Sequence, residues 1–174
     1  MSMILNLNRF RSPLERVERT FEPGEFRLED DDFRIVEPVQ LSLEINKDGD
    51  KFRLVGSVKT TLETPCSRCL EPFAIPVDAA FDLMYLPRTQ APGDDEKEVD
   101  EDDVGVSYYT DDEINLADLM REQFYLSMPM KPLCRPECLG LCPVCGTNRN
   151  VATCACKSEW VDPRLDALRH LKGQ

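Results

Sequence analysis

Cysteines are the residues of this chain whose spacing could support chemistry, and six of the eight lie within 23 residues near the C-terminus. Cys142 and Cys145 form a C-x2-C pair just before Gly146, whose freedom to adopt positive φ suits a metal-binding turn. Four thiolates presented as two close pairs leave no ligand position open and are typical of a closed, tetrahedral Zn2+ site. The spacing therefore predicts a structural zinc site with the ligands Cys142, Cys145, Cys154 and Cys156.

The other four cysteines form two pairs that are far apart in the sequence. Cys66 and Cys69 make another C-x2-C pair, about 65 residues before Cys134 and Cys138. Together they could form a second four-sulfur site that joins the N-terminal part of the chain to the Cys-rich segment. In a rival arrangement, Cys134 or Cys138 enters the downstream site and leaves Cys66 and Cys69 free or redox-active. The first hypothesis predicts about two zinc equivalents per chain.

Disulfide bonds are the main alternative use of eight cysteines. The N-terminal apolar run is too short, and too interrupted by Asn and Arg, to resemble a secretion signal. A cytoplasmic chain keeps its thiols reduced, and clustered thiols then favour a metal over disulfides. The sequence CPVC also resembles the motif of dithiol oxidoreductases, but theirs joins a strand to a helix, whereas this one lies among turn residues. We expect a cytoplasmic protein without membrane spans.

The charge of the chain favours a basic partner. It has 21 Lys and Arg against 33 Asp and Glu, a net charge of −12, which disfavours an electrostatic grip on nucleic acid phosphates. Residues 94–103, the acid run, hold eight acidic residues and one lysine. They can be interpreted as a solvated loop without a specific role, or as a mobile arm that attracts a basic ligand.

Catalytic motifs are absent from the sequence. His170 is the single histidine and lies near the C-terminus, which gives little support for a triad or a proton relay. No phosphate-binding glycine loop and no G-x-S-x-G motif occurs. Since a site of four thiolates also leaves no position for a substrate water, we expect no catalytic residue and no enzymatic activity.

Alternating apolar residues predict the strands that must position the cysteines. Apolar and polar residues alternate over 39–46, 52–62 and 73–85, the period of half-buried strands. Asp48-Gly49 predicts a tight hairpin between the first two stretches, and Gly56 indicates a bulge in the second. The pair Cys66 and Cys69 then falls at the tip of a second hairpin, with its sulfurs projecting from the end of a rigid sheet.

The remaining elements are predicted from shorter signals. Residues 3–9 favour an edge strand, and the capping-box pattern Ser12-Pro13-Leu14-Glu15 predicts a short helix toward Thr20. Apolar residues at helical spacing follow Asn115 and predict a helix over 115–127, and Asp162-Pro163 predicts a last helix.

Together these elements indicate an α+β fold: an antiparallel β-sheet or partly open barrel with a packed helix, then a Cys-rich zinc-knuckle segment and a terminal helix. We assign residues 1–130 to the mainly antiparallel β domain, with an acidic loop at 87–113 and the helix at 115–127. Residues 131–174 form the zinc-binding Cys-rich segment and the C-terminal helix.

Several stretches of the chain resemble the YceD-like family, whose members are described as large ribosomal RNA subunit accumulation proteins. The matching stretches, in colinear order, are CSRCLEPF at 66–73, REQF through Met128-Pro129, LCRPECLGLCPVCG at 133–146, CAC at 154–156 and DPRL at 162–165.

The resemblance implies a role in accumulation of large-subunit ribosomal RNA in bacteria and plastids, with a gene often beside that of a small basic large-subunit protein. It carries over no catalytic residue. We expect a non-enzymatic, zinc-stabilised ribosome-assembly factor that binds a ribosomal protein or a large-subunit precursor particle. Arg53, Lys59 and Arg68 could still touch RNA locally. The alternative is a thiol-based redox sensor or oxidoreductase that uses Cys66 and Cys69.

Overall fold

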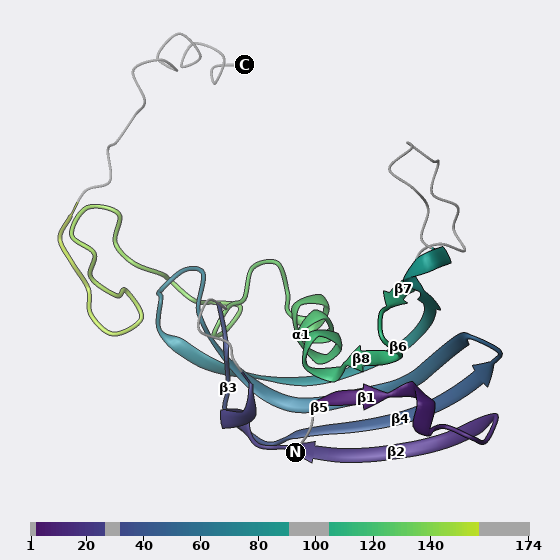
Figure 1. Ribbon diagram of the computed structural model, residues 1–174. Coiled ribbons are helices and arrows are strands. Elements are labelled where there is room, and N and C mark those ends of the chain that lie inside the picture. Colours follow the sequence, from purple (N-terminus) through teal and green to yellow (C-terminus); the bar gives the residue numbers. More distant parts are fainter. Residues whose placement is uncertain (1–2, 27–31, 91–104, 157–174) are drawn as a thin grey trace, which may run out of the picture.

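The protein is described by a computed structural model over residues 3–26, 32–90 and 105–156 (Figure 1). One sheet has the strand order β2-β4-β5-β6-β7, with β3 paired to the far end of β5, and a second small sheet pairs β1 with β8. Helix α1 (Leu116–Ser127) follows β8 directly. The strands are β1 (Ile4–Asn6), β2 (Leu14–Phe21), β3 (Arg34–Ile35), β4 (Val39–Asp48), β5 (Lys51–Pro65), β6 (Pro72–Pro87), β7 (Val106–Tyr109) and β8 (Glu113–Asn115). Short 3-10 helices cover Leu7–Arg9, Pro23–Glu25 and Arg88–Gln90.

Two long hairpins form the centre of the sheet. Asp48 pairs with Lys51 across a two-residue turn, and Gly49 takes a φ of 62° there, which confirms the first predicted hairpin. The second hairpin pairs β5 with β6 from Phe52 opposite Tyr85 to Pro65 opposite Pro72. Its tip carries the Cys66 to Cys69 turn beyond the end of the core.

Gly56 does not form the predicted bulge. The ladder from β4 to β5 runs through it without interruption, with Gly56 opposite Leu43. A Cβ at this position would lie 2.2 Å from the backbone oxygen of Ser42 and 3.1 Å from the ring of Phe81. The glycine therefore lets neighbouring groups approach the strand closely.

The segment predicted as a helix after Ser12 is strand β2. Its eight residues pair with β4 from Leu14 opposite Asn46 to Phe21 opposite Val39. An isolated helix of this length is marginal in water, whereas the strand satisfies the hydrogen bonds of an otherwise open β4 edge. Of the expected capping box, the structure retains a contact from the Ser12 amide to Oε1 of Glu15, at 3.4 Å.

Helix α1 covers one face of the sheet (Figure 1). Asn115 caps it by accepting a hydrogen bond from the Ala117 amide at 3.0 Å, and its predicted apolar stripe is buried. Burial of each large apolar side chain contributes roughly 1.5–3 kcal/mol. The core contains inward residues of β4, β5 and β6 together with those of α1, namely Val39, Leu41, Leu43, Ile45, Phe52, Leu54, Val58, Leu62, Val77, Phe81, Tyr85, Leu116, Leu119, Met120 and Phe124.

The α+β class with an open sheet is consistent with this architecture, with two corrections to the details. The pairing of β6 with β7 is parallel, and β1 lies in a separate two-stranded sheet with β8. The region expected as an acidic loop at 87–113 also contains β7 and the start of β8. The acid run and the predicted C-terminal helix lie outside the described residues. Among the described helices, none has the length and apolar character needed to cross a membrane.

Candidate metal centres

The turn between β5 and β6 positions the first pair of cysteines. The amide of Cys66 donates to the Glu71 carbonyl at 2.9 Å, and the Leu70 amide donates to the Cys66 carbonyl at 2.9 Å. Leu70 takes a φ of 61°, a left-handed conformation that closes the turn. These bonds fix the Cys66 and Cys69 side chains at the end of the sheet.

The segment after α1 returns to this turn and supplies the second pair. The Ser67 amide donates to the Pro132 carbonyl at 2.8 Å, and the Leu141 amide donates to the Arg68 carbonyl at 3.0 Å. Gly140 has a φ of 70°, and a Cβ there would lie 2.9 Å from the Arg68 oxygen. Only glycine allows this close approach without strain.

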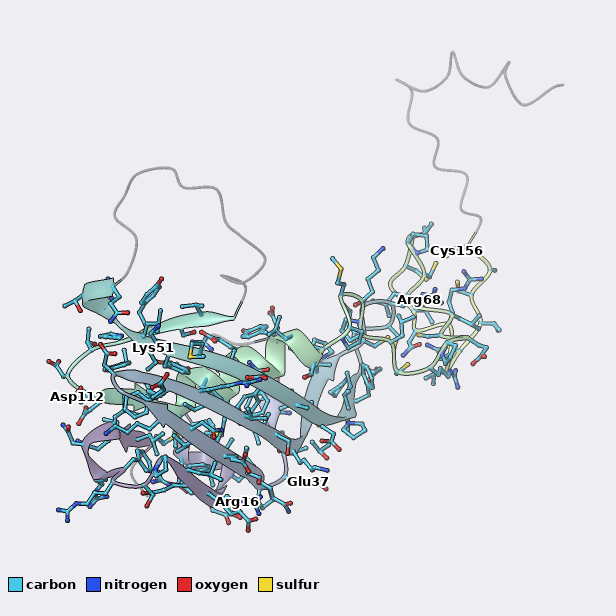
Figure 2. All side chains as sticks on the ribbon, turned by 90° about the vertical axis from the view of Figure 1, so that its right-hand side faces the viewer. Arg16, Glu37, Lys51, Arg68, Asp112 and Cys156 are labelled. Carbon is cyan, nitrogen blue, oxygen red and sulfur yellow. The ribbon has the colours of Figure 1, made fainter. Side chains whose placement is uncertain are left out.

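Arg68 fastens the turn to the Cys-rich segment with its side chain. Its Nη1 donates to the carbonyl of Cys138 at 2.9 Å and to that of Pro136 at 3.3 Å. Figure 2 shows Arg68 within the Cys-rich end of the molecule, apart from Arg16 on β2 and Glu37 between β3 and β4. Arg53 and Lys59, the other two cations considered for RNA contact, form ion pairs with Asp82 and Asp78.

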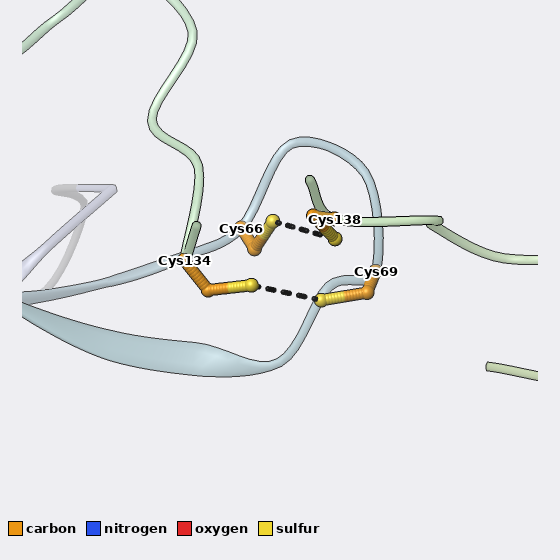
Figure 3. Close-up of side chains that lie close together, drawn as sticks. All are labelled: Cys66, Cys69, Cys134 and Cys138. Carbon is orange, nitrogen blue, oxygen red and sulfur yellow. Dashed lines mark hydrogen bonds between the residues drawn. The ribbon is translucent and has the colours of Figure 1, made fainter. Parts of the chain in front are cut away.

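Four thiols converge where the turn meets the segment, and we call them the sheet-tip thiol group (Figure 3). The Sγ atoms of Cys66 and Cys138 are 3.8 Å apart, and those of Cys69 and Cys134 are also 3.8 Å apart. All four Sγ atoms lie within 4.8 Å of one another. Three of the four residues are buried and Cys134 is exposed. The members are Cys66, Cys69, Cys134 and Cys138.

The pKa values of these thiols move in opposite directions. Burial acts to raise the pKa of Cys66, but backbone N–H groups of Cys134, Cys69 and Arg68 outweigh it and lower the pKa to about 6. Burial and the neighbouring thiols raise the pKa of Cys134 to about 12. The pKa of Cys138 is lowered and that of Cys69 is raised. Cys66 thus ionises readily, while the crowded thiols oppose ionisation of Cys69 and Cys134, a conflict that a bound cation would remove.

A second cluster, the terminal thiol group, lies in a short ribbon further along the chain. The Gly146 amide donates to the Cys142 carbonyl at 2.9 Å, and the Cys142 amide donates to the Thr147 carbonyl at 2.8 Å. Gly146 has a φ of 73°, as the sequence predicts for this turn. The members, Cys142, Cys145, Cys154 and Cys156, also lie with all Sγ atoms within 4.8 Å of one another.

The terminal thiol group is more exposed and shows the same division of charge. Cys142 is buried, while Cys145 and Cys156 are exposed. The hydroxyl and amide of Thr147 lower the pKa of Cys145 to about 6, and the Thr147 Oγ1 lies 3.1 Å from its sulfur. The hydrogen bond with Cys145, burial and the charge on Cys145 together raise the pKa of Cys156 to about 12.

Asn150, which lies between the two cysteine pairs of the terminal thiol group in the sequence, contacts the sheet-tip thiol group. Its Nδ2 donates to Sγ of Cys138 at 3.3 Å, and its Oδ1 accepts from the Leu139 amide at 2.9 Å. The Arg149 amide also donates to the Gly140 carbonyl at 2.9 Å. An asparagine between cysteine pairs carries no spacing signal of its own, so this role is visible only in the tertiary structure.

The grouping of the eight cysteines is that of the first sequence hypothesis. The structure brings Cys66 and Cys69 together with Cys134 and Cys138, and it does not draw either of the latter into the downstream cluster. Each group offers four thiol ligands and could hold a metal ion.

The fold and these clusters define an open-sheet α+β protein with two four-cysteine groups at one end. Residues 54–172 match the family model described as "Large ribosomal RNA subunit accumulation protein YceD". The chain belongs to this family.

Relatives with this description occur in plants. The chain is 29% identical over 163 residues to the chloroplastic large ribosomal RNA subunit accumulation protein YCED homolog 1 of Zea mays, an alignment that covers 78% of this chain and 53% of the maize protein. The Arabidopsis thaliana homolog 1 is 27% identical over 161 residues, with 79% of this chain and 49% of the relative covered. The chain thus spans about half the length of these relatives.

A bacterial relative matches over a larger share of its length. The uncharacterized protein YlbN of Bacillus subtilis is 26% identical over 159 residues, which cover 90% of this chain and 87% of the relative. No solved structure matches the chain significantly.

Proposed function

We propose that this protein supports the accumulation of large-subunit ribosomal RNA as a non-enzymatic, zinc-stabilised assembly factor, which binds a ribosomal protein or a large-subunit precursor particle. The observation that carries the proposal is the family match over residues 54–172. The names of the maize and Arabidopsis relatives support the same process.

Zinc fits the thiol geometry. In a tetrahedral site with Zn–S bonds of about 2.3 Å, neighbouring sulfurs are separated by about 3.8 Å. The sulfurs of Cys66 and Cys138, and those of Cys69 and Cys134, lie 3.8 Å apart. A disulfide would bring two sulfurs to about 2.05 Å. We therefore assign one zinc ion to the sheet-tip thiol group and a second to the terminal thiol group.

A structural role for zinc follows from the composition of the Cys-rich end. Besides its cysteines, the sheet-tip cluster contains only two apolar side chains among the described residues, the partly buried Phe73 and Leu133. Val144 and Val151 are 61% and 84% exposed. With so little apolar burial, metal–sulfur bonds would supply the free energy that orders this end, and structural zinc contributes about 10–16 kcal/mol in small domains.

The same thiol sets support a non-enzymatic role. Four protein sulfurs complete a tetrahedral shell, so zinc held in this way would present no coordination position to a substrate or a water molecule. His170 lies outside the described residues.

The alternative redox function at Cys66 and Cys69 is disfavoured by their burial. These residues are 0% and 4% exposed, and a thiol that reacts with an oxidant or a partner disulfide needs access. The low pKa of Cys66 is better explained as preparation for binding a cation.

Net charge favours a basic protein as the direct partner. At −12 the chain repels RNA phosphates and attracts a basic ribosomal protein. In the described part, Arg53, Lys59 and Arg68 are held by internal contacts, so RNA would meet few free cations on the hairpins.

The proposal is tested in cells that lack the gene. We expect mature large-subunit ribosomal RNA to fall relative to small-subunit RNA, and to recover with the wild-type gene but not with the Cys66→Ser, Cys69→Ser variant. The tagged protein should co-sediment with large-subunit precursors or co-purify with a ribosomal protein at moderate salt. Unchanged RNA ratios in the deletion cells, together with recovery of neither class of partner, would overturn the proposal.

A further inference from the structure

A groove of about 470 Å³ lies at the end of the molecule away from the thiol groups. It runs along β7 and is closed on its other side by β8 and the first turns of α1. Figure 1 shows β7 at the opposite end of the sheet from the Cys-rich segment. Its lining includes Tyr85, Ser107, Tyr109, Glu113, Asp118 and Glu122.

Three carboxylates line the groove. Among the residues that the structure describes, none of Glu113, Asp118 and Glu122 forms an ion pair, although Asn115 donates to Oδ2 of Asp118 at 2.7 Å. Carboxylates on the outer face of the sheet differ, because Asp78 and Asp82 are each paired with a lysine or an arginine. The groove therefore concentrates uncompensated negative charge.

A buried tyrosine forms part of the groove wall. Tyr85 is 7% exposed, and in the described part of the chain Ser107 is the side chain that offers its hydroxyl a hydrogen bond. Burial raises the pKa of Tyr85 to about 12, and the charge of Glu122 contributes in the same direction. The hydroxyl stays protonated at neutral pH and keeps hydrogen-bonding capacity for a ligand. By contrast, the hydroxyl of Tyr109 already donates a hydrogen bond to the Asp50 carbonyl at 2.8 Å.

The backbone of β7 offers a second kind of contact. β7 is the last strand of the sheet and pairs with β6 on one side, from Met84 opposite Val106 to Pro87 opposite Tyr109. On its other side, no strand within the described ranges pairs with it. An edge strand of this kind can pair with an extended segment of another protein, which gains main-chain hydrogen bonds from the edge and specificity from the side chains around it.

We propose that this groove binds an extended, basic segment of a protein partner, which lies along β7 and places lysine or arginine side chains against Glu113, Asp118 and Glu122. The inference rests on the proposed function and assigns the binding of its basic protein partner to this groove. The three carboxylates would repel nucleic acid phosphates, and a second copy of a chain with a net charge of −12 is also a poor match.

Calorimetry with the 174-residue chain in its zinc-loaded form tests the groove directly. The probe is a synthetic decapeptide of alternating lysine and valine, and its comparison is the same peptide with glutamate in place of lysine. We expect the lysine peptide to bind with an affinity that falls as salt is raised, and the glutamate peptide not to bind. The amide NMR signals of Ser107, Tyr108 and Tyr109 should shift on binding.

Two variants with the same net charge distinguish binding at the groove from a general effect of the protein's net charge. The groove variant is Glu113→Gln, Asp118→Asn, Glu122→Gln, and the control variant removes three carboxylates from the outer face of the sheet by Glu18→Gln, Glu44→Gln, Asp78→Asn. We expect the groove variant to raise Kd for the lysine peptide about tenfold or more and the control to change it less than about threefold, since local charges dominate over distant ones. Equal losses in both variants would overturn the proposal.

A third variant and a cellular readout complete the test. Replacing the acidic residues of the acid run with Ser, Asn or Gln should leave the NMR shifts at β7 in place. If it abolishes binding while the groove variant does not, the groove is not the site. If the wild-type protein self-associates and the groove variant does not, the groove binds a second copy of the chain instead of a basic partner. In deletion cells, full rescue of ribosomal RNA by the groove variant would overturn the groove as partner site and leave the proposed function intact.

Discussion

The guanidinium of Arg68, at the tip of the sheet, donates to the backbone carbonyl of Cys138 at 2.9 Å. The same side chain reaches Pro136, and the backbone carbonyl of Arg68 accepts from the Leu141 amide. The sheet tip and the Cys-rich segment are therefore joined by hydrogen bonds beside the thiols. This arrangement brings the four sulfurs of the sheet-tip thiol group close together, so that a metal would bind a largely prepared site.

Replacing Arg68 with methionine should destabilise the zinc-loaded protein. The change keeps most of the aliphatic length but removes both side-chain hydrogen bonds to carbonyls of the segment, a loss of about 1–3 kcal/mol for bonds from a charged group. Urea unfolding followed by circular dichroism measures it. Arg53→Met is the matched control, because that arginine pairs with Asp82 on the exposed face of the sheet and should matter less. Equal effects of the two changes would contradict the role given to Arg68.

Zinc content should divide evenly between the two thiol groups. We expect two zinc ions per wild-type chain by native mass spectrometry and elemental analysis, since the eight cysteines form two sets of four. The variants Cys66→Ser, Cys69→Ser and Cys142→Ser, Cys145→Ser should each retain one. A Cys66→Ser, Cys69→Ser variant that keeps all its zinc would show that the sheet-tip thiol group holds no metal.

Chelators should remove zinc from the terminal thiol group first. Cys145 and Cys156 are exposed, whereas three members of the sheet-tip thiol group are buried. A chelator or an oxidant needs access to the sulfurs, so zinc release should show a fast and a slow phase of equal amplitude. The fast phase should be missing in the Cys142→Ser, Cys145→Ser variant. If that variant instead loses the slow phase, the terminal thiol group is the one that releases zinc slowly, contrary to the prediction.

Zinc binding should release fewer protons than four ordinary thiols would. In the metal-free protein the pKa of Cys66 is about 6, so at pH 7 this thiol has already lost its proton, while Cys134, with a pKa of about 12, must lose its proton to zinc. We expect no more than about three protons per zinc at pH 7, compared with nearly four from unperturbed thiols. Affinity should rise with pH above 7 and fall more steeply below pH 6, where Cys66 also takes up a proton. Calorimetry in buffers of different ionisation enthalpy counts the protons released. A value near four per zinc would show that none of the thiols has lost its proton before zinc binds.

Local patterns in the sequence were sufficient for the central hairpins and the helix. Alternation over 39–46 and 52–62 places Leu41 and Leu54 in the core because the side chains of a strand alternate between its faces. Asn115 marks the start of α1 because a capping side chain accepts a hydrogen bond from an amide of the first turn, here that of Ala117. The C-x2-C pairs are equally local, since each is contained in a single turn.

Tertiary structure alone decided the features that join distant segments. The stretch after Ser12 has a helix-capping pattern, yet it forms β2 because the open edge of β4 offers a complete ladder of hydrogen bonds. Cys66 lies 72 residues from Cys138, and no local signal states which cysteine pairs meet. Arg68 and Asn150 gain their roles in the same way, from carbonyls and a sulfur that only the folded chain brings near. The sequence by itself determines the turns and the ligand types, and the chain's return to the sheet tip determines which of them share a site.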